Sequence, residues 1–114
     1  MSDCIFCNIA SGKMKSDIVW ENDNIVAFRD INPQAPTHIL VIPREHLPKI
    51  ADTTEQDQDL LGELILAART IAGQEGIAED GYRLVFNNGD HGGQDVYHIH
   101  LHLLGGRQLS WPPG

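Results

Sequence analysis

Three histidines alternate with apolar residues near the end of the chain, in the stretch VYHIHLHLLGG. They are His98, His100 and His102, half of the six histidines in the sequence. If the stretch is a strand, side chains two positions apart share a face and lie ~6.6 Å from each other. The three imidazoles are therefore expected on one face. The opposite face, packed in the core, is expected to hold Ile99, Leu101 and Leu103.

A glycine-rich loop, NNGDHGGQ, comes shortly before these histidines. Imidazole is a nucleophile near neutral pH and can also donate protons there. The amide side chains and glycine N–H groups of such a loop are suited to holding phosphate oxygens. The combination favours covalent chemistry on phosphorus over a solvated strand face. Covalent chemistry on phosphorus is also favoured over a zinc site made of the three imidazoles, because such a site usually has a carboxylate nearby.

Length and charge limit the class of protein. The 114 residues are expected to form one domain, 1–114, with a short tail at 107–114, and the formal net charge is −8. Nucleic-acid-binding proteins usually gather Lys and Arg on one face, but here the eight basic residues are scattered. We therefore expect no nucleic-acid partner and no binding to anionic membranes. An anionic small molecule remains compatible, because backbone N–H groups can hold a phosphate.

The chain is expected to stay in the cytosol. No apolar run approaches the ~18 residues that a membrane span needs. The start of the chain, MSDCIFCNIASG, lacks the basic and apolar layout of a signal peptide. In a reducing compartment, the pair Cys4 and Cys7 suggests metal or redox chemistry more than a structural disulfide.

The pattern of apolar residues predicts an α+β fold with an antiparallel sheet of about five strands. A short helix is expected over CIFCNIASG, ending near Gly12, and a loop over the proline-containing INPQAP. The expected strands are Ile18 to Glu21, Asn24 to Asp30, Thr37 to Pro43, the run GYRLVFNNG, and Val96 to Gly106.

One long helix should cover a face of this sheet. Thr54 and Asp57 have the spacing of a capping box at its start, and Gly73 or Gly76 would end it. Apolar residues recur at helical spacing and predict a single buried face. They are Leu60, Leu61, Leu64, Ile65, Ala68, Ile71 and Ala72.

Several separated blocks of the sequence resemble one known family. The stretch from His98 to His102 followed by two leucines matches the H-x-H-x-H signature of the histidine triad family. Further matching blocks are FRDINPQAPTHILVIPREHL, GYRLVFNNG, GGQDVYHIHLHLLGGRQ and the terminal WPPG. From about Ile18 to Gly114 the chain thus resembles the nucleotide-binding branch of that family.

The resemblance implies a homodimeric enzyme with a HIT-like fold. Such proteins hydrolyse purine nucleoside phosphoramidates, of the adenosine 5'-phosphoramidate type, to a nucleoside monophosphate and an amine through a nucleotidyl-histidine. His100 matches the nucleophile and His102 the histidine that positions the phosphate. His98 and His38 match supporting members of the active site. No cofactor is implied for the catalytic steps.

The nucleotide-binding residues also follow from the resemblance. Asp30 matches the acidic residue that holds the ribose hydroxyls, a role that suits a carboxylate acceptor. Phe28 and Ile31 match the walls of the base pocket. Positions near the ribose and phosphate are matched by Asn87, Gly93 and Gln94.

Two features set this chain apart from many relatives of the branch. Asp95 stands where a Ser or Thr hydroxyl often faces the phosphate or the leaving group. The Cys4 and Cys7 pair is absent from many members, whereas other histidine triad proteins bind zinc through such a pair and two histidines. His46 and His98 match those histidines, and a Cys2His2 set is a sound structural zinc site.

Two alternatives remain beside phosphoramidate hydrolysis. Sister branches of the family act as dinucleoside polyphosphate hydrolases or nucleotidyl transferases, but the GGRQ and WPPG blocks favour the first activity. The other alternative is a nucleotide-binding regulatory or scaffold dimer whose turnover is incidental, but binding alone would not need His100 as a nucleophile. The expected partners are thus a purine nucleotide and a second copy of the chain.

Overall fold

Strand β3, Thr37–Pro43, lies at the centre of the sheet and is buried along its whole length. Its sequence, THILVIP, is mostly apolar and lacks a polar–apolar alternation, which is typical of a strand covered on both faces. A computed structural model describes residues 3–114. Met1 and Ser2, which belong to the stretch that was compared with a signal peptide, lie outside the described residues. The strand predicted from Thr37 to Pro43 is confirmed at both ends.

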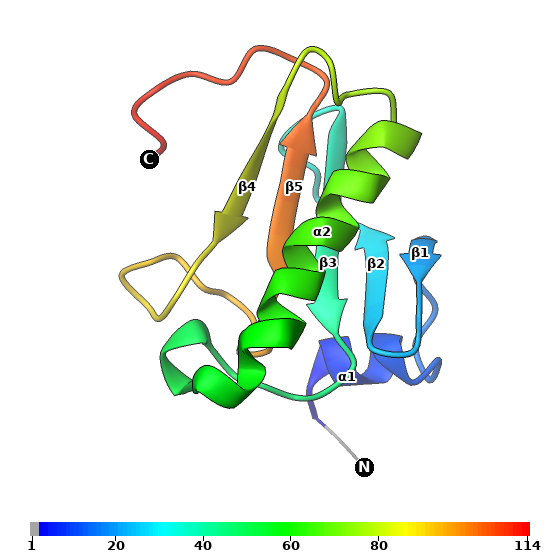
Figure 1. Ribbon diagram of the computed structural model, residues 1–114, viewed down its shortest axis with the longest axis vertical. Coiled ribbons are helices and arrows are strands. Elements are labelled where there is room, and N and C mark those ends of the chain that lie inside the picture. Colours follow the sequence, from blue (N-terminus) through cyan, green and yellow to red (C-terminus); the bar gives the residue numbers. More distant parts are fainter. Residues whose placement is uncertain (1–2) are drawn as a thin grey trace.

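Four further strands complete one antiparallel sheet in the order β1-β2-β3-β5-β4 (Figure 1). Their bounds are Ile18–Glu21 for β1, Ile25–Arg29 for β2, Tyr82–Phe86 for β4 and Leu101–Gly105 for β5. The predicted α+β class and the five antiparallel strands are confirmed. β1 and β4 form the two edges, so β5, which carries histidine, lies between β3 and β4.

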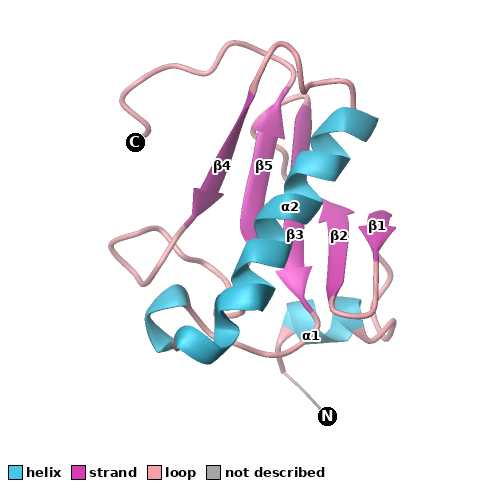
Figure 2. Cartoon of the chain, in the orientation of Figure 1, coloured by secondary structure: helices cyan, strands magenta, loops and turns pink. Residues whose placement is uncertain are grey.

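Helices cover both faces of the sheet (Figure 2). The long helix α2, Gln58–Gln74, packs through Leu64 and Ile71 on a core that includes Val41 of β3. The short helix α1, Ile5–Ala10, packs through Phe6 on a second cluster that includes Leu40 of β3. Because neighbouring residues of a strand point to opposite faces, the two helices lie on opposite sides of β3.

The start of α2 follows the predicted capping box. The Thr54 hydroxyl accepts from the Gln56 N–H, and the Asp57 carboxylate accepts from the Thr54 N–H at 2.9 Å. A 3₁₀ turn, Glu55–Asp57, precedes the α-helix, and another, Ile50–Asp52, lies before it. The predicted apolar face is wrong at one position, because Ile65 is 45% exposed.

The last strand is shorter than the predicted span from Val96 to Gly106. Strand β5 begins at Leu101, opposite Val41 of β3. Before that point the ladder stops, because the Ile99 N–H donates to the Leu47 carbonyl and the Pro43 carbonyl accepts from the His98 side chain. From His98 to Leu103, successive side chains still point to opposite faces of the sheet. Ile99, Leu101 and Leu103 pack with α2, whereas the rings of His98 and His100 contact Phe6 of α1.

The C-terminal tail leaves the end of β5 and runs past β4 (Figure 1). Its Trp111 is 79% exposed, and the Ser110 carbonyl accepts from Arg83 of β4 at 2.8 Å. A search of residues 3–114 finds no helix with the length and apolar character of a membrane span.

Candidate active site

A cavity of about 380 Å³ opens on the face of the sheet that carries the histidines. Its walls come from α1, the loop between α1 and β1, the end of β2 with the loop after it, the middle of β3, and β5 with the segment before it. Six predicted site residues line it: Phe28, Asp30, Ile31, Asp95, His100 and His102. These residues are up to 74 positions apart in sequence (102 minus 28), so the sheet brings them together.

His100 is buried and held in one tautomer by the backbone. Its Nδ1 lies 2.8 Å from the carbonyl oxygen of His98, which can only accept, so Nδ1 carries the proton and donates. In a neutral ring the other nitrogen, Nε2, then keeps its lone pair. Phe6 packs edge-on against the same ring, with centroids 5.0 Å apart. The arrangement leaves a nucleophilic nitrogen in a buried imidazole that lines the cavity.

A chain of hydrogen bonds sets the tautomer of His102. The Gln34 N–H donates to Nδ1 of His38 at 3.0 Å, so neutral His38 carries its proton on Nε2. That Nε2 lies 2.9 Å from Nδ1 of His102 and donates to it. His102 is therefore protonated on Nε2. Among the described residues, this Nε2 is the one buried side-chain polar atom without a hydrogen-bond partner.

Burial keeps these imidazoles neutral. It lowers the pKa of His102 to about 4, with further lowering from His100 and His38. Burial likewise lowers the pKa of His38, although the Asp30 carboxylate opposes this. Because both pKa values lie below the ordinary 6.5, His38 and His102 are mostly neutral at pH 7, and the tautomers derived for these two rings hold there.

Asp30 and Asp95 place carboxylates at two sides of the cavity. Oδ1 of Asp30 accepts from the Asn32 N–H at 2.8 Å, while Oδ2 lies 3.5 Å from Nε2 of His38. Each carboxylate oxygen has two acceptor sites, so Asp30 retains capacity for ligand hydroxyls. Oδ1 of Asp95 lies 3.6 Å from Nε2 of His100, and its side chain is 82% exposed. That separation is too long for a hydrogen bond.

The glycine-rich loop does not offer the free N–H groups expected from its sequence. The N–H groups of Gly92, Gly93 and Gln94 donate to carbonyls within the loop, and that of Gly89 donates to the Gln94 side chain. The loop closes on itself because Gly93 adopts a φ of 84°, which glycine tolerates.

Asn87, Gly93 and Gln94 do not line the cavity. The Gln94 amide nitrogen donates to the carbonyls of Pro48 and Val96, so this side chain braces the segment before the histidines. Contacts of the three residues with ribose or phosphate stay a prediction.

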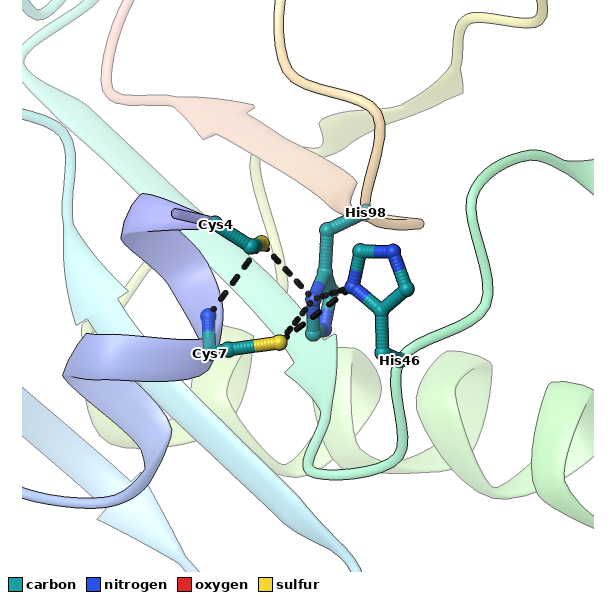
Figure 3. A group of neighbouring side chains, drawn as sticks. All are labelled: Cys4, Cys7, His46 and His98. Atoms are coloured by element: carbon teal, nitrogen blue, oxygen red, sulfur yellow. Dashed lines mark hydrogen bonds between the residues drawn. The ribbon is translucent and has the colours of Figure 1, made fainter. Parts of the chain in front are cut away.

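Cys4, Cys7, His46 and His98 form a second cluster beside the cavity, and Figure 3 shows their side chains converging. Their ligand atoms all lie within 4.8 Å of one another. The two thiols are not joined in a disulfide. Helix α1 presents both cysteines, since its first turn lies between them.

The geometry of this cluster suits a tetrahedral zinc ion. Zinc bonds of about 2.3 Å to sulfur and 2.0 Å to nitrogen place a sulfur and a nitrogen ligand about 3.5 Å apart, and two nitrogens about 3.3 Å. The Cys7 Sγ lies 3.2 Å from Nδ1 of His46 and 3.5 Å from Nδ1 of His98, and the two Nδ1 atoms are 3.3 Å apart. Because Nε2 of His98 donates to the Pro43 carbonyl, its Nδ1 lone pair faces the thiols.

Several residues of the cavity wall were not predicted as site residues. Ile5, Phe6 and Ile9 belong to α1, where the sequence predicted a helix but no site residue. Met14, Lys15 and Ser16 belong to a loop in which no motif indicates a function. Only their position across the sheet from the histidines brings them to the site, and a single sequence gives no local signal for that.

A larger hollow, of about 580 Å³, lies at the other end of β4 and β5. Arg83 and Arg107 are among the residues that line it, together with Asp80. It contains no histidine or cysteine and none of the predicted site residues. The chemistry expected from the sequence is therefore confined to the smaller cavity and the Cys/His cluster.

Comparisons with known proteins agree with the geometry. Residues 11–109 match the HIT domain. The chain is 55% identical over 108 residues to the purine nucleoside phosphoramidase of Escherichia coli K12, covering 95% of this chain and 91% of that protein. It is 52% identical over 115 residues to the 14 kDa zinc-binding protein of Zea mays, covering 99% and 89%.

A solved structure has the same fold at high similarity. The HIT family hydrolase from Legionella pneumophila superposes with a TM-score of 0.97 at 55% identity, and the match covers 98% of this chain and 100% of that one. A histidine triad protein from Clostridium difficile matches with a TM-score of 0.94 at 40% identity, covering 96% of each chain. The chain therefore belongs to the HIT domain family.

Proposed function

We propose that this protein hydrolyses purine nucleoside phosphoramidates to a nucleoside monophosphate and an amine. The observation that carries the proposal is the pair of opposite tautomers in the cavity: Nε2 of His100 bears a lone pair, and Nε2 of His102 bears a proton without a partner. A nucleophile beside a hydrogen-bond donor suits attack on a phosphorus whose oxygens need stabilising. The E. coli relative named as a purine nucleoside phosphoramidase supports the substrate class.

In the first step, Nε2 of His100 attacks the α-phosphorus. A bond from nitrogen to phosphorus forms, and the bond from phosphorus to the amine nitrogen breaks. The amine leaves with the bonding electron pair and takes up one proton from solvent, which the water of the second step returns. His102 donates its Nε2 proton in a hydrogen bond to a phosphoryl oxygen, which stabilises the charge that builds there.

In the second step, water attacks the phosphorus of the nucleotidyl-His100. The bond to Nε2 breaks, the water loses a proton, and the nucleoside monophosphate leaves. The hydrogen bond from Nδ1 of His100 to the His98 carbonyl persists through both steps and stabilises the ring when it is positively charged.

The nucleoside is proposed to lie across the sheet from the histidines. Asp30, next to His38, accepts hydrogen bonds from the ribose hydroxyls. Phe28 and Ile31 wall the base, and the 97% exposed side chain of Ile31 gives the rim of the cavity an apolar surface. A flat base can bury apolar area against both.

Dinucleoside polyphosphate hydrolysis would use the same nucleophile but a different leaving group. Rates on adenosine and guanosine phosphoramidates, measured beside those on diadenosine tri- and tetraphosphate, separate the two activities. A nucleotide-binding regulatory dimer with incidental turnover would act only slowly on both classes.

Cys4, Cys7, His46 and His98 are proposed to hold a structural zinc ion. Zinc would supply a rigid link between α1 and the segment that carries His98, and the catalytic steps do not use it. In the cytosol, where we expect the protein, both cysteines would remain reduced and able to bind metal.

The protein is further proposed to be a homodimer. On α2, Ile65 and Leu66 are 45% and 51% exposed, and Leu84 of the edge strand β4 is 36% exposed. Leu84 pairs with Leu103, which packs under α2, so all three lie on the same side of the sheet. An edge strand beside exposed apolar residues suits a self-complementary contact. The extended tail with Trp111 would then reach toward the partner.

The nucleophile is tested by His100→Ala. We expect less than about 1% of wild-type kcat/KM, because loss of a nucleophile costs more than ~3 kcal/mol of transition-state stabilisation. Mass spectrometry of wild-type reactions quenched with denaturant at alkaline pH, where the acid-labile P–N bond persists, should find the nucleotidyl group on the peptide with His98 to His102. The exposed His91 serves as the control, and His91→Ala should be active. Higher residual activity in His100→Ala would reject the mechanism.

The neutral state of His102 is tested by the pH dependence of folding stability. Its folded pKa of about 4 lies below the unfolded value of about 6.5, so the unfolded chain binds the extra proton between these pH values. Stability should therefore fall as the pH drops through this window. His102 is only partly buried, and screening limits its share to about 1 to 2 kcal/mol. Urea unfolding measures the free energy of unfolding at each pH. Between pH 6.5 and 4 this free energy should fall by about 1 to 2 kcal/mol less in His102→Gln than in the wild type. The same pH dependence in both proteins would contradict a neutral His102.

The charge of Asp95 is tested by Asp95→Asn. Its carboxylate lies near the nucleophile and should repel the phosphate of the product. Because the side chain is exposed and screened, we expect AMP to bind about 3-fold to 5-fold more tightly to the variant. Titration calorimetry at pH 7 measures this. An unchanged dissociation constant would place the Asp95 carboxylate outside the reach of the phosphate.

The zinc site is tested by elemental analysis of the purified protein. About one zinc per chain is expected for a closed Cys2His2 site. Cys4→Ser should lower both the zinc content and the melting temperature, whereas His91→Gln should retain the metal. Less than about 0.2 zinc per chain after metal-supplemented expression would contradict a structural zinc site.

Light scattering at micromolar concentration tests the dimer. The wild type should have twice the chain mass, and Leu66→Glu should shift it toward the monomer, because a buried unpaired carboxylate is costly. Lys13→Glu, which changes an exposed residue of the loop after α1, is the control. A monomeric wild type would overturn the proposal.

A further inference from the structure

The strand register shows how the cavity runs across the sheet, from the histidines on β5 to the loop before β1. His102 pairs with Leu40, Leu40 with Phe28, and Phe28 with Ile18. Paired residues of antiparallel strands point to the same face, so these four side chains form one row across the sheet. Strands lie ~4.8 Å apart, which makes the row about 14 Å long. A nucleoside monophosphate with its phosphorus at His100 spans much of that distance.

Lys15 lies at the far end of this row. It precedes Ile18 by three residues and lines the cavity with Met14 and Ser16. The loop is tied at both sides, because the Met14 N–H donates to the Asn8 carbonyl at 3.0 Å and the Arg29 N–H donates to the Asp17 carbonyl at 3.0 Å. Lys15 is thus placed where the base of a bound nucleotide ends.

Lys15 is also the available cation of the cavity wall. Arg29, the other cation there, is held by Glu75 through bonds of 2.8 and 3.0 Å and lies 3.6 Å from Asp17. Within residues 3–114, no carboxylate forms an ion pair with Lys15. Its ammonium group can therefore donate to a ligand without breaking an existing pair.

Apart from Ser16 and the paired Arg29, the rest of this end of the cavity is apolar and does not distinguish one purine from another. The Ser16 hydroxyl can donate or accept, so it suits either base. Ile9, Met14 and Phe28 offer flat or flexible apolar contacts to any base. Guanine presents two acceptors, O6 and N7, on one edge, whereas adenine places the donor N6 amine beside N7. An ammonium group is attracted to the first edge and meets a like donor on the second.

We propose that Lys15 makes this enzyme prefer guanine, or hypoxanthine with the same O6 and N7 edge, over adenine. The proposal rests on the proposed phosphoramidate hydrolysis and adds the residue that selects the base. Lys15 acts on binding and on kcat/KM through the base and takes no part in the bond changes at phosphorus.

The test compares guanosine, inosine and adenosine phosphoramidates that carry the same amine. The wild type should show a guanosine to adenosine ratio of kcat/KM of about 5 or more, and inosine should follow guanosine because it keeps O6 and N7. Lys15→Met should bring the guanosine to adenosine ratio below about 2. Lys15→Glu, which accepts from the adenine amine, should reverse it. Lys13→Met, the same change two positions earlier and outside the cavity wall, should keep the wild-type ratio.

Two results would overturn the role of Lys15: a wild-type preference for adenosine, or a ratio that Lys15→Met leaves unchanged. A preference for guanosine that inosine does not share would assign recognition to the guanine amine and also reject it. If no phosphoramidate is hydrolysed, the proposed function fails. Calorimetry with GMP and AMP on the same variants then tests Lys15 through the ratio of the two dissociation constants, with the same limits of about 5 for the wild type and about 2 for Lys15→Met.

Discussion

Hydrogen bonds to the backbone fix which ring nitrogen carries the proton in His38, His98 and His100, and therefore which nitrogen presents a lone pair or a donor to the cavity and to the Cys/His cluster. The carbonyls of His98 and Pro43 accept from Nδ1 of His100 and Nε2 of His98, and the Gln34 N–H donates to Nδ1 of His38. An imidazole ring can present either a donor or a lone pair at each nitrogen, so an unconstrained ring would interconvert. Here the backbone removes that freedom. The lone pair on Nε2 of His100 and the lone pair on Nδ1 of His98 follow from these hydrogen bonds. The proton on Nε2 of His102 needs one more, which His38 donates to Nδ1 of His102.

The fold supplies these backbone groups by interrupting its own sheet. A longer β5 would pair with Pro43 and occupy the carbonyl that His98 uses. Ending the ladder at Leu101 leaves His98 and His100 in an extended segment that α1 covers with Phe6. Burying polar rings without partners would be costly, and the hydrogen bonds to backbone offset that cost. His98 also belongs to the Cys/His cluster, so the proposed zinc ion and the nucleophile share one residue as a support.

The sequence predicted most of the elements because their signals are local. THILVIP is apolar without interruption, and Thr54 with Asp57 has the spacing of a capping box, so β3 and the start of α2 are confirmed. The alternation of histidines with apolar residues also survives, although β5 is shorter than expected, because alternation needs only an extended backbone and not a paired one. Ile65 shows the opposite case. Helical spacing places it on the apolar face, but the width of the sheet decides how much of that face is covered.

Features that depend on distant backbone atoms were beyond the sequence. Nothing near Pro43 indicates that its carbonyl meets His98, which lies 55 positions further along the chain. The bond from the Gln34 N–H to His38 spans only four residues, but it depends on the turn that the loop before β3 adopts, and no motif in that loop specifies it. The glycine loop was expected to present N–H groups to phosphate, but it uses them for its own turns. Lys15 carried no signal, because only the register of three strand pairs places it opposite the histidines. Roles of single residues at phosphate and ribose came from family resemblance and remain proposals.

Nitrogen NMR of the imidazole rings at pH 7 tests the central claim most directly. With ring nitrogens labelled and the His100→Ala and His102→Gln variants used for assignment, each neutral ring reports which nitrogen bears the proton. The tautomers derived above predict a proton on Nδ1 and a lone pair on Nε2 for His100, and the reverse for His102. A proton on Nε2 of His100, or averaging between the two forms in either ring, would contradict the account.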